Sequence, residues 1–379
     1  MATTVSHANS KRVVYMSDLH GGRPGFFVGW ERLRHGQLHW LAESFAEAMG
    51  VFMYVYAGVG STAVWVIGNL TEKVGFSSLL QIGFGYAAGI MLAVSICSAT
   101  SGGHFNPCIT IVQMLFKGFP PLKGARYIAS QIFGGYIACL LIYLQYSTTL
   151  KALEVAAGPA LASIQFTPNG PAGIFALYVN PGSNLGHVFV NEFVCDFFLA
   201  IVIFGSVDPS NVLIPPSMAA PMIAMAYAAA IWGFAGVGLS ANSARDLGGR
   251  FAAMTIWGKD AAGDSGYAAI AALTNIPATI LAFIVYELMF VDSDRVVSQD
   301  HREFHDIHAL HRRHGPATLA AADRDSAPRY HYSRIIGFHR DVELSVKTID
   351  SCVMYIFSDM NSVQSRSGQK PILLRGPGI

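Results

Sequence analysis

The chain has 379 residues, of which 52% are hydrophobic and only 13% are charged, and its mean hydropathy is +0.41. A soluble domain carries about twice that charged fraction, so the composition argues against a soluble protein. The net charge is +1 and no basic patch is interleaved with aromatic residues, which excludes nucleic acid as a partner. The five cysteines show neither metal-site spacing nor a disulfide framework, so we expect no metal and no cofactor.

Long stretches without charge predict a polytopic, all-α membrane protein. They cover residues 74–116, 127–150, 155–191, 209–244 and 265–286. Most of them hold the roughly 20 apolar residues that a spanning helix needs. Six spans are predicted: Leu38–Ile67, Ser77–Ser98, Arg126–Gln145, Gly186–Val207, Ser217–Gly236 and Gly266–Phe290.

Two further apolar segments, Asn106–Phe116 and Asn242–Trp257, are too short to cross a bilayer. We expect them to be re-entrant half-helices, because irregular backbone at membrane depth survives only inside protein or beside a wet cavity. This arrangement favours a transport path.

The distribution of Lys and Arg predicts the topology. Both tails and the connection after Phe116 are rich in basic residues, whereas residues 147–185 hold one Lys and one Glu. Both termini are therefore expected in the cytoplasm and the 147–185 loop outside. The first 36 residues contain no apolar run, so no cleavable signal is expected. Asn69 begins an external glycosylation sequon close to the membrane, and its occupancy stays open.

The domain layout follows from these elements. It comprises a cytoplasmic tail at residues 1–37, a membrane domain at 38–291 and a cytoplasmic tail at 292–379. The membrane domain divides into a first repeat at about 38–146, the external loop at 147–185 and a second repeat at about 186–291. Glu47 and Glu192 lie in the first span of each repeat. Three spans per repeat force the second repeat to insert inverted, which is a transporter and channel architecture.

Each repeat places an Asn where a glycine-bearing loop becomes a short helix. Asn is among the best N-cap residues, and Pro107 after Asn106 is preorganised for a helix start. Two such N-termini meeting at mid-bilayer would each present about half a positive charge. The amides of Asn106 and Asn242 could then donate to one passing oxygen, which would break a proton-conducting chain and oppose cations. The extended stretches Gly102–Phe105 and Gly238–Ala241 could add carbonyl acceptors along the path.

At these motifs the chain resembles the major intrinsic protein family, the aquaporins and aquaglyceroporins, over about residues 40–290. The resemblance rests on Glu47 with Gly50 and on the segments 101–107, 129–134 and 242–246. It implies a homotetramer with a separate pore in each protomer and passive flow. The pore motifs that it assigns are Asn106, Pro107, Cys108, Asn242, Ser243 and Ala244.

Two residues of these motifs depart from the family pattern. Cys108 stands where Ala is usual, and Ser243 stands where Pro is usual. Ser keeps a good helix start but loses some rigidity, so the second Asn is expected to be less firmly placed. Cys108 is expected beside the narrow centre of the pore, where it would confer sensitivity to mercurials.

The resemblance places a selectivity filter at Tyr86, Ala230, Leu239 and Arg245. Arg245 would repel cations and donate to hydroxyl groups, while Ala230 would leave a wide and less polar opening.

Two positions after Arg245 resemble the glycerol-conducting branch of the family. Asp246 follows the Arg directly, and Arg250 lies four residues further on. Leu273 and Thr274, however, do not reproduce that branch's Pro-Leu pair. The solute class therefore leans towards small neutral solutes.

Four residues are expected to support the pore: Glu47, Glu192, His104 and Gln131. The two acids lie inside spans, where carboxylates are costly and need partners, and they are expected to accept from backbone N–H groups of the re-entrant loops. Asp196, one turn after Glu192, has no assigned role.

Histidines recur at positions 301, 305, 308, 311 and 314 in the C-terminal tail. They could form a pH or metal sensor, or simply lie on a solvated helix. Gating by either tail stays open.

The sequence as a whole predicts a passive channel for water and small neutral solutes, such as glycerol and hydrogen peroxide, which excludes protons and ions. It would be surrounded by membrane lipid, in the plasma membrane, and would catalyse no reaction. The alternative is a secondary active transporter of a small polar solute, which would need coupling-ion ligands near the midplane. A membrane enzyme is a weaker third, because no nucleophile or metal-ligand set accompanies His104.

Overall fold

The computed structural model describes residues 14, 16, 24–73, 75 and 77–313. Most of the N-terminal tail and the segment from His314 onward, with its proposed role in sensing or gating, lie outside the described residues. Within the described part, helices make up all of the regular structure. The prediction of an all-α protein is confirmed.

Six elements among the described residues are long and apolar enough to cross a membrane, as predicted. They are α3 (His39–Leu70), α4 (Leu79–Ser101), α6 (Pro121–Ala157), α8 (Leu185–Val207), α9 (Ala219–Phe234) with the short η3 (Pro216–Met218) before it, and the pair α11 (Ser265–Leu273) and α12 (Asn275–Met289).

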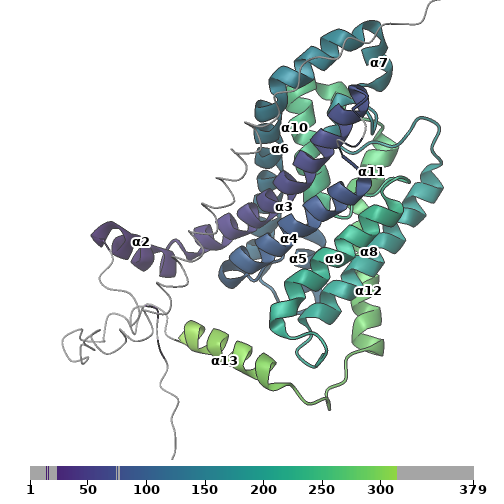
Figure 1. The fold of residues 1–379 in the computed structure, drawn as a ribbon. Coiled ribbons are helices and arrows are strands. Elements are labelled where there is room, and N and C mark those ends of the chain that lie inside the picture. Colours follow the sequence, from purple (N-terminus) through teal and green to yellow (C-terminus); the bar gives the residue numbers. More distant parts are fainter. Residues whose placement is uncertain (1–13, 15, 17–23, 74, 76, 314–379) are drawn as a thin grey trace, which may run out of the picture. The chain divides into compact units, whose positions relative to one another are not determined.

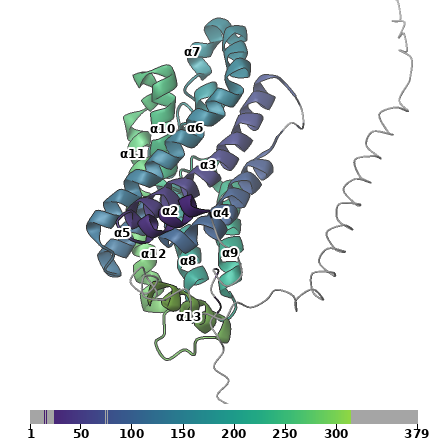
Figure 2. The same ribbon diagram turned by 90° about the vertical axis from the view of Figure 1, so that its left-hand side faces the viewer.

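Two short helices complete the repeats. Helix α5 (Pro107–Phe116) follows α4, and α10 (Ser243–Trp257) follows α9, so the order long, long, short, long recurs in both halves. Helix α5 packs against α6 and α12, whereas α10 packs against α6. Both views place α10 towards the end of the long helices that carries α7 (Leu161–Ile164), and α5 towards the opposite end (Figure 1, Figure 2). The half-helices therefore enter from opposite ends, as an inverted repeat requires.

Glycines allow the long helices to approach closely. A Cβ on Gly134 of α6 would lie 2.0 Å from the carbonyl oxygen of Ala48 in α3. A Cβ on Gly248 of α10 would lie 2.7 Å from the backbone nitrogen of Tyr136 in α6. Both distances are shorter than a side chain tolerates, so α6 can contact α3 and α10 backbone to backbone only with glycine at these positions.

The third span is longer than predicted. Helix α6 continues to Ala157 and is followed by η1 (Gly158–Ala160) and α7, whereas the external loop was expected from residue 147. The reason is local: the residues after Gln145 include the helix formers Leu, Ala, Lys and Glu, and the first glycine comes only at Gly158. The turn η2 (Pro171–Ile174) and the adjacent Phe175 are buried, so this segment folds onto the helices instead of remaining a solvated loop.

The sixth span is broken at Thr274, between α11 and α12. Pro277 lies in the first turn of α12 and has no N–H for the carbonyl of Leu273, which explains an interruption four residues earlier. Thr274 and Asn275 at this break are 4% and 1% exposed, so the break faces the protein interior.

Two helices flank the spans. Helix α2 (Gly25–His35) exposes Phe26, Phe27 and Trp30 beside basic residues in its last turn. Helix α13 (Gln299–Arg313) carries four of the predicted histidines and contacts η3. One of these, His301, is buried, and its Nδ1 lies 2.9 Å from Ser298 Oγ.

Candidate functional site: a paired helix start beside an internal cavity

Each predicted Asn caps its half-helix. The Oδ1 of Asn106 accepts from the backbone N–H of Cys108 at 2.8 Å. The Oδ1 of Asn242 accepts from the backbone N–H groups of Ala244 at 2.9 Å and Arg245 at 3.3 Å. Both Asn residues are extended, and the helix starts directly after them, as the sequence predicts.

The two loops that lead to these caps touch. Asn242 Nδ2 donates to the carbonyl oxygen of Phe105 at 2.9 Å, across the interface between the repeats. Phe105 and Ala241, the residues before each Asn, have φ angles of 47° and 59°. This left-handed conformation is strained for residues other than glycine and persists only where the surroundings enforce it.

The two buried glutamates supply that enforcement. Glu47 accepts from the backbone N–H groups of His104 at 3.0 Å and Phe105 at 2.8 Å. Glu192 accepts from Ser240 at 2.7 Å and Ala241 at 2.8 Å. Each strained residue is thus held by the glutamate of its own repeat. The predicted contact between these acids and the loop N–H groups is confirmed.

Gln131 joins the first of these supports. Its Nε2 donates to Glu47 Oε2 at 2.7 Å and to Thr110 Oγ1 at 3.1 Å. Ser101 Oγ donates to Glu47 Oε1 at 2.6 Å, and His104 Nδ1 lies 3.0 Å from Thr110 Oγ1. Sequence reasoning found Gln131 and His104 but missed Ser101 and Thr110, because small hydroxyl residues in apolar helices give no distinctive pattern.

The second loop has no such side-chain network. Glu192 accepts only the two backbone N–H groups in the part of the chain that the structure describes. Asn191, the residue before it, donates instead to the carbonyl of Gly238 at 2.9 Å. The two repeats are therefore alike in their glutamates but unequal in the number of groups that support them.

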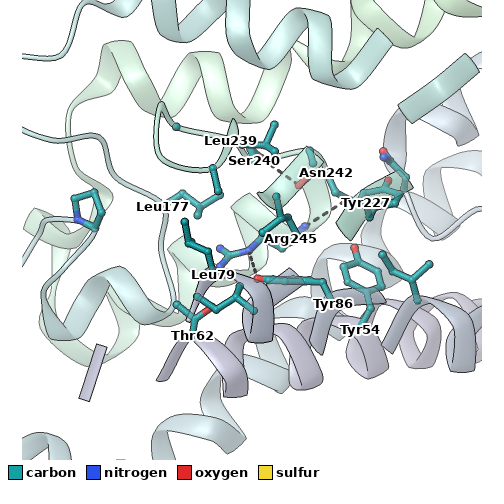
Figure 3. A pocket seen from close by; sticks show the side chains of 18 of the residues that line it. Tyr54, Thr62, Leu79, Tyr86, Leu177, Tyr227, Leu239, Ser240, Asn242 and Arg245 are labelled. Atoms are coloured by element: carbon teal, nitrogen blue, oxygen red, sulfur yellow. Dashed lines mark hydrogen bonds between the residues drawn. The ribbon is translucent and has the colours of Figure 1, made fainter. Parts of the chain in front are cut away.

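Arg245 is 4% exposed and fixed by two acceptors from separate elements. Its Nε donates to the hydroxyl of Tyr86 in α4 at 3.0 Å (Figure 3). Its Nη1 donates to the carbonyl oxygen of Phe175 at 2.7 Å. Tyr86, which the family resemblance placed in the selectivity filter, thus lies beside Arg245. Phe175 was not predicted, since it lies in the segment that was expected to be an external loop.

Asp246 and Arg250 pair with each other. Arg250 Nη2 lies 2.6 Å from Asp246 Oδ1, and both side chains are buried. Arg250 also donates to the carbonyl oxygens of Ala262 at 2.6 Å and Leu177 at 3.2 Å. This pair ties α10 to the segments that contain Leu177 and Ala262. Neither residue lines the cavity beside Arg245.

A cavity of about 310 Å³ lies beside Arg245 and the starts of the two half-helices. Asn106 and Asn242 line it, together with the loop residues that precede each of them. Of the four predicted filter positions, Tyr86, Leu239 and Arg245 contribute to its wall. Figure 3 shows Arg245 and Tyr86 together, with Leu239 on the neighbouring loop.

Ala230 does not line this cavity, so its expected place at the opening is wrong. It is 1% exposed and packs in an apolar cluster that contains Leu239. From the same helix, Tyr227 and Ile231 reach the cavity instead. Helix α9 thus lies rotated relative to the expectation.

Tyr54 and Tyr227 are wall residues that sequence reasoning missed. The hydroxyl of Tyr54 lies 3.4 Å from the carbonyl of Phe105. Both rings come from helices whose apolar pattern gives no hint of which side faces the path, so only the helix packing reveals them.

Cys108 lies in the first turn of α5 but faces away from the cavity, contrary to the expectation. It is 1% exposed, and its Sγ donates to Asn275 Oδ1. Ser243 is also directed to Asn275, at 2.8 Å. The two departures from the family motif therefore point to the break in the sixth span.

The fold and the cavity together define a class: a membrane channel built from an inverted repeat, with two helix N-termini meeting beside an internal cavity. The sequence pattern of the major intrinsic protein family matches residues 35–261. The chain is 55% identical to "Aquaporin-3" of Laccaria bicolor over 80% of this chain and 92% of that one. It is 35% identical to "Aquaglyceroporin-2" of Rhizophagus irregularis over 55% of this chain and 63% of that one.

The fold matches a solved structure as well. The aquaglyceroporin from Plasmodium falciparum superposes with a TM-score of 0.57, at 20% identity, over 66% of this chain and 96% of that one. The chain belongs to the major intrinsic protein family. It is a passive channel for water and small solutes, and the comparisons give the transporter alternative no support.

Proposed function

We propose that this channel conducts glycerol and other small neutral solutes, hydrogen peroxide among them, as well as water. The observation that carries the proposal is the position of Arg245 in the cavity wall, with its guanidinium fixed by Tyr86 and Phe175. Leu239 adds an apolar surface to the same wall. A polyol has hydroxyl groups on one side and C–H groups on the other, so a wall of both kinds suits it.

Arg245 and the Asn pair would also exclude ions. A buried guanidinium repels cations in a cavity of low dielectric constant. The N-termini of α5 and α10 add partial positive charge beside Asn106 and Asn242. A water whose oxygen accepts from both Asn amides points its hydrogens outward, which interrupts proton transfer along the file.

Pore-supporting roles follow for the residues behind the wall. Glu47, His104 and Gln131 hold the first loop, and Glu192 holds the second, so that the carbonyl groups of both loops line the path. We assign the pair of Asp246 and Arg250 the same kind of role, namely holding α10 and Arg245 against the external segments.

Variants at Arg245 test the proposal. Arg245→Lys keeps the charge but loses the rigid fork that reaches two acceptors, so glycerol flux relative to water flux should fall while ions stay excluded. Arg245→Val removes the charge, so proton or cation conductance should appear. Stopped-flow light scattering and a pH-sensitive dye in proteoliposomes measure both.

Arg126→Val is the matched control, because Arg126 is exposed on α6 and contacts the ring of Trp40, away from the cavity. It removes one positive charge from the protein and should change neither the glycerol-to-water flux ratio nor the exclusion of protons and cations. If Arg245→Lys and Arg126→Val gave the same glycerol-to-water ratio as the wild type, Arg245 would have no part in solute choice.

The remaining features of the proposal concern the assembly. The protein is proposed to be a homotetramer in the plasma membrane, with both tails in the cytoplasm and no catalytic activity. Support comes from family membership and from the Lys and Arg distribution. Native mass spectrometry in detergent tests the oligomeric state. Protease protection of tags placed after residue 20 and after residue 370 tests the orientation.

A further inference from the structure

Four buried polar residues meet behind the cavity wall, each from a different helix. Cys108 comes from α5, Ser243 from α10, Asn275 from α12 and Asp196 from α8. Their exposed fractions are 1%, 3%, 1% and 3%. None of the four lines the cavity. We call these residues the Asn275 cluster.

Asn275 is the hub of the cluster. Its Oδ1 accepts from Cys108 Sγ and lies 2.8 Å from the hydroxyl of Ser243. Its Nδ2 donates to Asp196 Oδ1 at 3.4 Å. Cys108 Sγ and Ser243 Oγ lie 3.5 Å apart, which closes a triangle between the first turns of the two half-helices and the sixth span.

The break in the sixth span is what makes these contacts available. The hydroxyl of Ser243 also lies 2.7 Å from the carbonyl of Ala272, in the last turn of α11. The last carbonyls of a helix have no partner in a following turn, and α11 ends at Leu273. A proline at position 243 could donate to neither acceptor, because it has no side-chain hydroxyl.

Asp196 is the residue whose presence most needs a reason. A carboxyl group inside a membrane span is costly and is retained where it serves a function. Its Oδ1 accepts from Asn275, and its Oδ2 is buried without a hydrogen-bond partner among the described residues. The Asn275 amide is the one side chain that joins this acid to Cys108 and Ser243.

We propose that the Asn275 cluster is a positioning unit that holds the first turns of α5 and α10 in register, and with them the side chains of Asn106 and Asn242. Hydrogen bonds from Ser243 and Cys108 do here what a rigid proline ring does at the start of a helix. The two departures from the family pattern, Cys108 and Ser243, and the otherwise unassigned Asp196 are then parts of one device. The inference rests on the proposed place of the Asn pair in the solute path.

A mutant cycle tests the proposal. Ser243→Ala removes one donor, and the pair Asp196→Leu with Asn275→Leu replaces hub and acid together, so that no buried carboxylate loses its only donor. The single variant and the double variant should each lower water permeability per folded channel by about threefold to tenfold. The net free energy of one hydrogen bond corresponds to a factor of this size. Each should also raise proton conductance, because the Asn amides no longer meet the same water. Combining all three substitutions should cause no further loss.

Rescue and control variants separate positioning from general damage. Ser243→Pro in the Asp196→Leu, Asn275→Leu background should restore water permeability and proton exclusion, because the ring fixes the helix start without the cluster. Ser206→Ala is the matched control, since Ser206 is a buried residue of α8 whose Oγ has no hydrogen-bond partner. Melting temperature is recorded for every variant, so that a fall in permeability is not mistaken for a fall in folded protein.

Additive losses, or single variants that behave like Ser206→Ala, would overturn the proposal. So would a Ser243→Pro variant that fails to rescue while it still folds. The cycle is measured on water, so it can be interpreted even if the channel proves not to conduct glycerol.

Discussion

Replacing Glu47 by glutamine should lower the stability of the folded protein more than the same change at Glu192. The two residues nevertheless occupy equivalent places in the repeats. Glu47 accepts from four donors: Ser101 Oγ, His104 N, Phe105 N and Gln131 Nε2. Among the residues that the structure describes, Glu192 accepts from two, the backbone N–H groups of residues 240 and 241.

The magnitude follows from counting donors that lose their acceptor. Each oxygen of Glu47 serves two donors, so an amide nitrogen in place of either oxygen leaves two buried donors facing another donor. At about 1.5–3 kcal/mol for a hydrogen bond to a charged group, the loss of two such bonds in Glu47→Gln should cost about 3–6 kcal/mol. Each oxygen of Glu192 serves one donor, so Glu192→Gln should cost about half as much.

Thermal unfolding of the purified channel in one detergent is monitored by size-exclusion chromatography. Water permeability is measured separately in proteoliposomes. Glu47→Gln should show the larger fall in melting temperature. Glu192→Gln should fold but conduct less, because the strained Ala241 is less firmly held. Equal melting temperatures for the two variants, or a larger fall for Glu192→Gln, would refute the reasoning.

Three further predictions concern other parts of the molecule. Tyr86→Phe removes one acceptor of Arg245, so the glycerol-to-water permeability ratio should change by about two- to tenfold while the melting temperature falls little; an unchanged ratio would argue against a shared role. Gly134→Ala should destabilise the protein by about 1–3 kcal/mol, because the added methyl meets the carbonyl of Ala48; a melting temperature equal to that of the wild type would contradict the close helix contact. Mercury(II) should inhibit Cys108→Ser to the same extent as the wild type, because the thiol is 1% exposed and faces away from the cavity. If mercury inhibited the wild type but not Cys108→Ser, Cys108 would face the solute path.

Much of the fold could be predicted from the sequence, because membrane burial leaves a strong trace in composition. The charge gaps gave the spans, and the Asn-Pro signal gave the start of α5. The length of α6 could not be predicted in this way. Its extension to Ala157 depends on helix propensity and on packing of Leu150, which is completely buried, and neither appears as an apolar run.

The site was predictable where it depends on backbone capping and not where it depends on helix rotation. Asn106 and Asn242 lie where their capping chemistry requires. Ala230 does not, because the side of α9 that faces the cavity is set by its packing against α4 and α8. Tyr54 and Tyr227 were missed for the same reason.

Buried polar networks were the least predictable part. Asp196 and Asn275 stand far apart in the sequence, and no local pattern links them. Only the break at Thr274, which turns Asn275 towards the half-helices, brings the two together.

We propose that the cavity beside Arg245 passes small polyols as well as water. Stopped-flow light scattering of wild-type proteoliposomes in a glycerol gradient tests this, with a sucrose gradient and empty liposomes as references. We expect fast shrinkage in sucrose, and in glycerol fast shrinkage followed by fast re-swelling that neither saturates nor needs an ion gradient. Fast shrinkage in both, with re-swelling no faster than in empty liposomes, would contradict it.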